Sequence, residues 1–267
     1  MTAPGLGDRR VALVTGAARG IGAATASALL DQGWYVGAVD RYADDPALPY
    51  SLARAEDLEA FVWREPNRIM ALEADVRDAA ALGEAVAQVE GSWGGLDAAI
   101  ACAGVIAGGM AAWELPPDQE RAVLEVNLGG VLNLARVAIP ALLRRPEPRR
   151  GRFLATVSAA ATRGFPGLAA YGAAKAGVTG FVRSLASDLR GTGVTANTVS
   201  PGPTRTAGLK ESARFYGLTD AESFARQVPI ERLVEPEEIA TVFAFLASDE
   251  VSAMTGTSVA VDGGHSL

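Results

Sequence analysis

Short runs of apolar and β-branched residues alternate along this chain with longer segments in which alanine and leucine recur at a helical period. The first run, Val11–Val14, is apolar at every position, which is typical of a parallel strand that helices cover on both faces. A helical segment follows each run before the next one begins. This alternation predicts a doubly wound α/β fold, with a parallel sheet of about seven strands and helices on both of its faces.

Two segments stand outside the regular alternation. The connection at 41–68 is predicted to be an insertion between the second and third strands, and 203–232 is predicted to be a substrate lid or a plain surface excursion. No linker rich in proline, glycine or serine divides the chain, so residues 1–267 are expected to form a single domain. The predicted strands are Val11–Thr15, Trp34–Asp40, Ile69–Ala74, Ala98–Ala101, Arg152–Val157, Thr195–Val199 and Ser258–Val261, and helices fill much of 21–31, 54–64, 79–91, 117–143, 170–190 and 236–247.

Three glycines follow the first predicted strand and open the first helix. Gly16, Gly20 and Gly22 stand in the run TGAARGIG, residues 15–22. The first glycine permits a tight turn, the second lets backbone approach a pyrophosphate, and the third allows close packing of helix on strand. This context predicts a Rossmann dinucleotide site, with Arg19 and Ile21 beside the nucleotide and the phosphates at the helix N-terminus.

An acidic residue, Asp40, ends the second predicted strand, where a carboxylate can hold the ribose hydroxyls of a dinucleotide. A 2′-phosphate there would be repelled by roughly 3 kcal/mol per unit of negative charge, at about 5 Å and an effective dielectric of about 20. NAD is therefore favoured over NADP. Arg19 and Arg41 oppose this preference, since either could pair with a 2′-phosphate, unless they lie on the surface or pair with Asp40. Asp75 and Val76, after the third strand, are expected at the adenine edge.

A tyrosine and a lysine stand four residues apart, at Tyr171 and Lys175. The chain contains only two lysines, Lys175 and Lys210, and its other basic residues are arginines. Positions i and i+4 share one face of a helix, so a phenol and an ammonium group can act on the same bound molecule. The pair predicts a site of proton transfer or redox chemistry.

Composition and charge exclude several other classes of function. The net charge of −7 and the pI of about 4.9 argue against nucleic acid as a partner, and the arginines at 144–152 are expected in a solvated loop. With one cysteine and one histidine, Cys102 and His265, neither a metal site nor a Ser-His-Asp hydrolase is expected. No apolar leader precedes Asp8, and the longest uncharged stretch is too short to span a bilayer. We therefore expect a cytoplasmic protein with no membrane association.

Together these motifs resemble those of the short-chain dehydrogenase/reductase family over nearly the whole chain. The resemblance implies that Tyr171 is the general acid/base, and that Lys175 binds the nicotinamide ribose and lowers the pKa of Tyr171. It further implies that Ser158 hydrogen-bonds the substrate oxygen and that Asn127 holds a water that relays protons. The motifs that carry it are the glycine run, Asp75-Val76, Ala103-Gly104, Asn127, Ser158, Tyr171 with Lys175, Pro201-Gly202 and Asp262-Gly263-Gly264.

The resemblance also implies where backbone meets the cofactor. Ala103 and Gly104 would pass close to it after the fourth strand. The nicotinamide side would be contacted by Pro201, Gly202, Thr204 and Thr206. Family members commonly carry Asn-Asn-Ala-Gly where this chain has Ala-Cys-Ala-Gly at 101–104. Cys102 is expected to be a small core residue rather than a nucleophile.

The insertion is similar to that of the mycofactocin-coupled members of this family, most closely in the run YSLA at 50–53. In that subfamily NAD is thought to stay bound and to be reoxidised by the redox peptide mycofactocin. We expect Pro46, Leu48, Pro49 and Tyr50 to fold over the adenosine half of NAD and slow its release. The alternative is a loop that only decorates the surface.

The resulting hypothesis is an NAD-dependent oxidoreductase that interconverts a small apolar secondary alcohol and its ketone by hydride transfer. The resemblance implies a homotetramer or homodimer that pairs through helices 117–143 and 170–190. The alternatives are an ordinary NAD(P)H-dependent ketoreductase with an exchangeable cofactor and, in another class, a non-catalytic dinucleotide-binding sensor. Candidate residues of the substrate pocket are Val105, Ile106, Ala159, Phe165, Leu168, Leu209, Phe215 and Tyr216.

Overall fold

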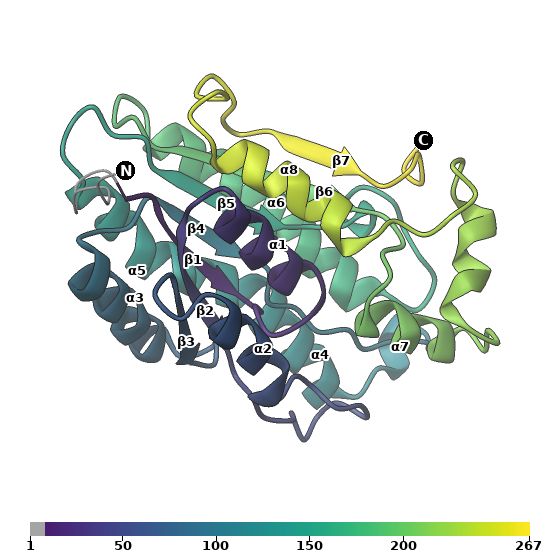
Figure 1. Ribbon diagram of the computed structural model, residues 1–267. Coiled ribbons are helices and arrows are strands. Elements are labelled where there is room, and N and C mark those ends of the chain that lie inside the picture. The colour runs from purple at the N-terminus through teal and green to yellow at the C-terminus, as the bar shows by residue number, and fades with distance from the viewer. Residues whose placement is uncertain (1–8) are drawn as a thin grey trace.

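One parallel sheet organises the computed structural model, which describes residues 9–267 (Figure 1). Its strands pair in the order β3-β2-β1-β4-β5-β6-β7, and helices cover both faces, so the predicted fold class is confirmed. The continuous apolar run of the first strand is buried at every position. The strands are β1 Val11–Thr15, β2 Tyr35–Asp40, β3 Ile69–Glu73, β4 Ala98–Ala101, β5 Arg152–Thr156, β6 Thr195–Pro201 and β7 Ser258–Val261.

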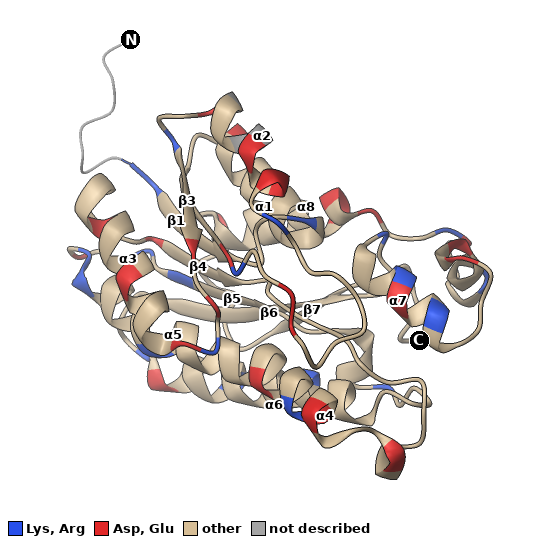
Figure 2. Cartoon of the chain, turned by 90° about the horizontal axis from the view of Figure 1, so that it is seen from below, with Lys and Arg blue, Asp and Glu red and all other residues tan. Residues whose placement is uncertain are grey.

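Two apolar layers hold the helices against the sheet. Successive residues of β1 face opposite layers, because side chains alternate along a strand. Leu13 packs in the layer that contains Leu134 of α5, and Val14 packs in the layer that contains Phe243 of α8. The helices are α1 Gly20–Asp31, α2 Glu56–Arg64, α3 Ala79–Trp93, α4 Pro117–Leu124, α5 Gly130–Arg144, α6 Ala169–Asp188, α7 Ala207–Phe215 and α8 Pro236–Ala247. Figure 2 shows acidic and basic residues interspersed over these outer helices.

The strand order reverses between β1 and β4. Strands β2 and β3 add to one side of β1, and β5, β6 and β7 add beyond β4 on the other side. In such sheets a crevice opens at the carboxyl ends of the two central strands, because their connections leave in opposite directions. Thr15 ends β1 beside Ala101, which ends β4, so these two residues mark where a ligand site is expected.

The helical run predicted at 117–143 is continuous but not uniform. Residues Glu125–Gly129 form a wider π-helical turn between α4 and α5, with Asn127 in its middle. Such turns insert an extra residue, so they re-aim nearby side chains, and they occur often at functional sites. By length and composition alone, the run Pro117–Arg144 could span a bilayer. Half of its most apolar part is buried inside the protein, as in a core helix.

The segment 203–232 holds more regular structure than predicted. Helix α7 begins after Thr206, whose hydroxyl accepts the N–H of Leu209 at 3.3 Å, and a 3-10 helix follows at Ala221–Gln227. Both are short and lack a long apolar period. A threonine before the helix and Gly217 after it were nevertheless local signals of its two ends.

Candidate active site

A cavity of about 1200 Å³ lies at the carboxyl ends of the strands. It exceeds the roughly 300–1000 Å³ of typical small-molecule sites, so it has room for an extended ligand. Every residue predicted for the site lines this cavity, although those residues come from segments far apart in the sequence. They are Gly16, Arg19, Gly20, Ile21, Gly22, Asp40, Arg41, Asp75, Val76, Ala103, Gly104, Asn127, Ser158, Tyr171, Lys175, Pro201, Gly202, Thr204 and Thr206.

Close backbone contacts fix the glycine-rich turn between β1 and α1. Gly16 and Gly20 have φ angles of 66° and 58°, a region that residues with a side chain rarely adopt. A Cβ on Gly22 would lie 2.0 Å from the Gly16 carbonyl oxygen, and one on Gly16 would lie 2.6 Å from the Cα of Ala103. The turn therefore brings the N-terminus of α1 close to the end of β4. N–H groups at such a helix start attract anions.

Asp40 ends β2 and braces the glycine-rich turn. Its carboxylate accepts the N–H groups of Ala18 at 3.0 Å and of Arg41 at 2.8 Å. The guanidinium of Arg41 does not pair with Asp40, contrary to one of the two explanations considered for it. It pairs with Asp45 at 2.9 Å, and its Nε lies 3.4 Å from Asp75. The backbone of Arg41, not its charge, therefore supports Asp40.

Lys175 carries a buried positive charge at the other end of the cavity. Tyr171 and Lys175 lie on one face of α6, as their spacing predicted, with the Lys175 Nζ 5.7 Å from the centroid of the tyrosine ring. The ammonium group donates to the carbonyl of Thr156 at 2.9 Å. Burial lowers the pKa of Lys175 to about 8, because a charged amine is poorly solvated there. The lysine is therefore charged at pH 7 but close to losing its proton.

Tyr171 and Ser158 form a hydroxyl pair beside this lysine. Burial raises the pKa of Tyr171, and the hydrogen bond with the Ser158 hydroxyl offsets that rise only in part. We expected Lys175 to bring the pKa of Tyr171 below its ordinary value. In the structure burial gives a net upward shift, and the group that lowers this pKa is Ser158 rather than Lys175, so the role of Lys175 towards Tyr171 stays a prediction. The phenol is protonated at neutral pH.

Asn127 uses its side chain to tie two segments together. Its Nδ2 donates to the carbonyls of Val105 at 2.8 Å and Val123 at 2.9 Å, and its Oδ1 accepts the Val105 N–H at 3.2 Å. Both amide hydrogens are thus used on backbone, and the side chain is fully buried. The side chain anchors the chain after β4 to the π-helical turn. The expectation that Asn127 holds a relaying water stays a prediction.

Comparison with known proteins assigns the chain to a family. The family model described as Enoyl-(Acyl carrier protein) reductase matches residues 16–266. The cyclohexanol dehydrogenase of Rhodococcus sp. (strain TK6) is 38% identical over 271 residues, which cover 96% of this chain and 95% of that protein. The chain belongs to the short-chain dehydrogenase/reductase family. It is therefore an oxidoreductase of the short-chain type.

Two solved structures similar to this short-chain dehydrogenase/reductase hold different nicotinamide dinucleotides. Carveol dehydrogenase from Mycobacterium avium, in complex with NAD, superimposes with a TM-score of 0.90 at 29% identity, covering 96% of this chain and 97% of that one. Actinorhodin polyketide ketoreductase, with NADPH, gives a TM-score of 0.86 at 30% identity, covering 97% and 98%. The overall likeness alone therefore does not choose between NAD and NADP.

Cys102 stands where other members of the family commonly carry an asparagine. Its Sγ accepts a hydrogen bond from the Thr156 hydroxyl at 3.4 Å, and Thr156 is also the residue whose carbonyl receives Lys175. Burial raises the pKa of the thiol to about 11. The thiol is protonated at neutral pH and packs with the core, which agrees with a small core residue rather than a nucleophile.

The insertion between β2 and β3 lies against the cavity. The Tyr50 hydroxyl accepts the N–H of Ile106 at 2.9 Å, and Arg19 donates to the carbonyl of Ser51 at 3.2 Å. Tyr50, Leu52 and Ala53 line the cavity. Burial raises the pKa of Tyr50 to about 12, so its hydroxyl stays protonated. The insertion thus joins the glycine-rich turn to the segment after β4.

The expected position of the insertion needs a correction. Pro46, Leu48, Pro49 and Tyr50 were predicted to cover the adenosine half, but of these four only Tyr50 lines the cavity. Leu48 is buried in the layer that packs against α3 and α5. Tyr50 contacts Ile106, and Ile106 directly follows Val105, the residue that Asn127 anchors. The contact of Tyr50 therefore lies towards the catalytic end of the cavity.

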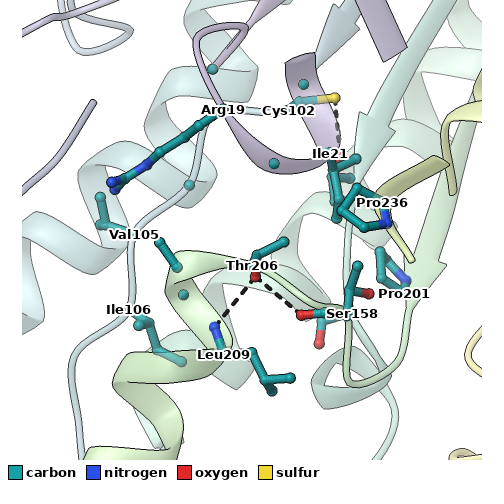
Figure 3. A pocket seen from close by; sticks show the side chains of 18 of the residues that line it. Arg19, Ile21, Cys102, Val105, Ile106, Ser158, Pro201, Thr206, Leu209 and Pro236 are labelled. Carbon is teal, nitrogen blue, oxygen red and sulfur yellow. Dashed lines mark hydrogen bonds between the residues drawn. The ribbon is translucent and has the colours of Figure 1, made fainter. Parts of the chain in front are cut away.

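Residues of the predicted substrate pocket line the cavity with one exception. Phe215 is absent from its lining and packs against Gly109, whose Cβ would lie 2.8 Å from the Phe215 Cβ. Figure 3 shows how several elements meet there: Arg19 and Ile21 from the first turn, Ser158 after β5 and Thr206 before α7. The residues of the pocket that do line the cavity are Val105, Ile106, Ala159, Phe165, Leu168, Leu209 and Tyr216.

His265 lines the cavity as well, although it was considered only as a hydrolase base. Its ring stacks on Phe165 at 5.3 Å between centroids, and its Nδ1 lies 3.4 Å from the Gln227 carbonyl. Burial lowers the pKa of His265, so the ring is neutral at pH 7. The Asp262 carboxylate accepts the N–H groups of Gly264 and Ser266, which folds the C-terminal segment back on the protein. The run Asp262-Gly263-Gly264 is a local signal for that turn, but the return of His265 to the cavity was not predicted.

Proposed function

We propose that this chain is an NAD-dependent oxidoreductase that interconverts a small apolar secondary alcohol and its ketone. The observation that carries the proposal is the hydroxyl pair of Ser158 and Tyr171 beside the buried ammonium of Lys175, in the same cavity as the glycine-rich turn. Two adjacent hydroxyls can hold a substrate oxygen and exchange its proton. The cation favours the anionic form of whatever oxygen lies next to it.

The residues along the cavity fit a bound NAD. Without a Cβ, Gly16 lets the turn pack closely against the backbone after β4, and the N-terminus of α1 suits a pyrophosphate. Asp40 stands where a carboxylate receives ribose hydroxyls. Gly104 lets the backbone pass close to the catalytic end, since a Cβ there would lie 2.8 Å from the Asn127 Oδ1 and 3.7 Å from the Lys175 Nζ. When bound, NAD supplies the hydride acceptor of oxidation and, once reduced, the hydride donor of reduction.

The chain's own residues manage the proton. Ser158 hydrogen-bonds the substrate oxygen, and Tyr171 takes the hydroxyl proton in oxidation or returns it in reduction. The raised pKa of Tyr171 keeps the phenol protonated at neutral pH, which is the form that reduction needs. Oxidation needs the phenolate, so it should become faster as pH rises. Lys175 holds the nicotinamide ribose, and Asn127 keeps the segment after β4 in place.

We propose NAD rather than NADP because of the acidic end of β2. Asp40 would repel a 2′-phosphate, and Arg41 is occupied by other carboxylates. The carveol dehydrogenase structure, which contains NAD, supports this preference. The ketoreductase structure with NADPH represents the alternative, an ordinary ketoreductase whose cofactor exchanges freely.

A cyclic alcohol or ketone fits the substrate end best. Both cyclohexanol dehydrogenase and carveol dehydrogenase are named for cyclic secondary alcohols. The aliphatic side chains of Val105, Ile106, Leu168 and Leu209 line this part of the cavity. They offer an apolar surface for a ring, while the polar groups at Ser158 fix its oxygen.

We further propose that NAD stays bound between turnovers and is reoxidised by a redox partner such as mycofactocin. The support is the pair of contacts that the insertion makes across the cavity, from Tyr50 to Ile106 and from Arg19 to Ser51. A nucleotide beneath these contacts is released only when they open.

The protein is also proposed to form a homotetramer or homodimer through the run Pro117–Arg144 and α6. Light scattering would measure the oligomeric state.

The test begins with the full-length protein as purified. After gel filtration, acid releases any retained nucleotide for identification by mass spectrometry, and we expect NAD in stoichiometric amount. Cyclohexanol and carveol are then assayed with added NAD and, separately, with an artificial electron acceptor. Turnover with the acceptor alone would support held NAD. An empty protein that works only with added NAD would support the exchangeable alternative, and NAD binding without turnover of any alcohol or ketone would support the sensor.

A further inference from the structure

Two carboxylates and one carbonyl, from the insertion and from the segment after β3, face the guanidinium of Arg41. Its Nη1 donates to the Asp45 carboxylate at 2.9 Å, and its Nη2 donates to the Asp44 carbonyl at 2.9 Å. Its Nε lies 3.4 Å from the carboxylate of Asp75. Each nitrogen of the guanidinium therefore already faces an oxygen of the protein. A phosphate would have to compete with these partners, two of which are carboxylates, for the two-pronged contact that arginine makes best.

The second arginine at this end, Arg77, is held in the same way. Its Nε and Nη2 bind the Asp75 carboxylate at 3.1 Å and 2.6 Å, and its Nη1 lies 2.9 Å from Asp45. Two arginines and two aspartates thus form one connected network with no net charge. The pKa of Arg77 is raised, chiefly by its hydrogen bonds with Asp75, so its charge is firmly retained within the network.

Asp45 is the centre of this network. One of its carboxylate oxygens receives both Arg41 and Arg77, and the other accepts the N–H of Ala47 at 3.0 Å. Only 4% of the residue is exposed, although it belongs to the insertion and lines the cavity. Burial acts to raise the pKa of Asp45, but the Ala47 N–H and the two arginines outweigh it, so the carboxylate stays ionised at neutral pH.

We propose that Asp45 is a positioning residue for cofactor selectivity: it holds Arg41 and Arg77 in ion pairs, so that neither guanidinium can receive the 2′-phosphate that distinguishes NADP from NAD. The inference rests on the proposed function, since it concerns the dinucleotide bound there. Asp40 disfavours the 2′-phosphate by its charge, whereas Asp45 acts indirectly, by occupying the arginines that would attract that phosphate. The insertion would then take part in choosing the cofactor as well as in covering it.

The test compares binding of NADH and NADPH, which needs no substrate. Retained nucleotide is first removed from the full-length protein with charcoal, and energy transfer from tryptophan to the reduced nicotinamide then reports each dissociation constant. Asp45→Asn keeps an oxygen for the Ala47 N–H but removes the charge that holds Arg41. We expect the ratio of the NADPH constant to the NADH constant to fall about tenfold or more, the size of one charge-assisted hydrogen bond.

Two further variants separate this role from a merely structural one. In Asp45→Asn the gain for NADPH should disappear when Arg41→Met is added, because Arg77 stays bound to Asp75 through Nε and Nη2 and the released guanidinium of Arg41 is then gone. In the wild-type background Arg41→Met should leave NADPH binding within about threefold, since Arg41 is already occupied, and this variant decides the question if Asp45→Asn does not fold.

The remaining outcomes would overturn either the selectivity role of Asp45 or the proposed function. An unchanged ratio in folded Asp45→Asn, or a gain that survives Arg41→Met, would overturn the selectivity role while leaving NAD binding intact. A loss of NADPH affinity of about tenfold in Arg41→Met alone would show that Arg41 is available in the wild type, and would overturn it too. A wild-type protein that binds neither nucleotide would overturn the proposed function itself.

Discussion

The cavity holds a cation at each end, and the two cations have different surroundings. Lys175 lies near Tyr171 at the catalytic end, and Arg41 lies beside Asp45 at the adenosine end. Lys175 is only 3% exposed, and the partner described for its ammonium group is a neutral carbonyl. Arg41 is less buried and faces two carboxylates. The charge of the lysine is therefore left uncompensated, whereas that of the arginine is neutralised.

This difference has two physical consequences. An uncompensated buried ammonium has a lowered pKa, so its charge responds to pH and to a bound ligand. A paired arginine keeps its proton and offers little attraction to a further anion, because its carboxylate partners are already in place. One end is suited to chemistry and the other to recognition.

The largest effect is expected when the proton-transfer group itself is removed. Tyr171→Phe keeps the ring but removes the hydroxyl that bonds Ser158, so turnover of an alcohol or ketone should fall by about 10²–10⁴-fold. NADH affinity should stay within about threefold, because the adenosine end is untouched. Steady-state rates and fluorescence titration measure the two quantities.

The matched control for this variant is Tyr35→Phe. Tyr35 begins β2 at the opposite end of the strand from Asp40 and packs on Trp93, so its hydroxyl should not affect turnover. Wild-type rates in Tyr171→Phe, or an equal loss in both variants, would contradict the assignment of the proton to Tyr171.

A large effect on stability is expected at Asn127, which supports the catalytic end without carrying charge. Asn127→Ala leaves the backbone groups of Val105 and the Val123 carbonyl without their partner. At about 1–3 kcal/mol for each unsatisfied buried group, the free energy of unfolding should fall by about 3 kcal/mol. Urea unfolding followed by circular dichroism measures it.

The same substitution at Asn133 is the natural comparison. Asn133 lies on α5 and donates to the carbonyls of Val76 and Arg77, but it is only partly buried. Water can replace those bonds, so Asn133→Ala should lose about 1 kcal/mol. Equal losses in the two variants would mean that the buried position of Asn127 in the π-helical turn adds nothing to stability.

The response of the catalytic end to pH should be smaller but specific. Because the pKa of Lys175 is about 8, the ammonium is present below pH 8 and is lost as the pH rises further. NADH affinity should therefore weaken between pH 7 and pH 9.5 by about five- to tenfold, if the ammonium holds the ribose. Tyr171 does not interfere, since its raised pKa keeps it protonated over this range.

The two lysines of the chain provide the control. Lys175→Met should bind NADH weakly and without this pH dependence, whereas Lys210→Met should retain the wild-type profile. A profile that is unchanged in Lys175→Met would assign the titration to another group, and the contrast between the two ends would lose its electrostatic basis.

The sequence predicted those parts of the molecule that depend on local pattern. Continuous apolar strands, the glycine-rich turn and the i, i+4 pair of Tyr171 and Lys175 are all visible within a few residues, and the fold class is confirmed. The residues predicted for the site all line one cavity, while their roles stay predictions.

What the sequence did not predict depends on contacts between distant segments. Asp45 and Arg77 are 32 positions apart by number and meet only because the insertion folds back on the end of β3. His265 reaches the cavity through a turn at the C-terminus, and the side-chain bonds of Asn127 require the π-helical turn. The raised pKa of Tyr171 follows from burial, which no motif encodes. Pattern thus locates the groups, but tertiary packing sets their charge state and their partners.

The smallest effect is expected where the insertion bridges the two ends. Tyr50→Phe removes the bond to the Ile106 N–H but keeps the ring against the cavity, so one contact over the nucleotide is lost while the cavity keeps its shape. A single neutral hydrogen bond contributes about 0.5–1.5 kcal/mol, so NADH should dissociate about two- to tenfold faster. Stopped-flow displacement by excess NAD measures that rate. Tyr216→Phe, in the segment 203–232, loses a bond to the Pro166 carbonyl and should release NADH at the wild-type rate. If both variants release it equally fast, the insertion has no particular hold on the cofactor, and the two ends of the cavity act independently.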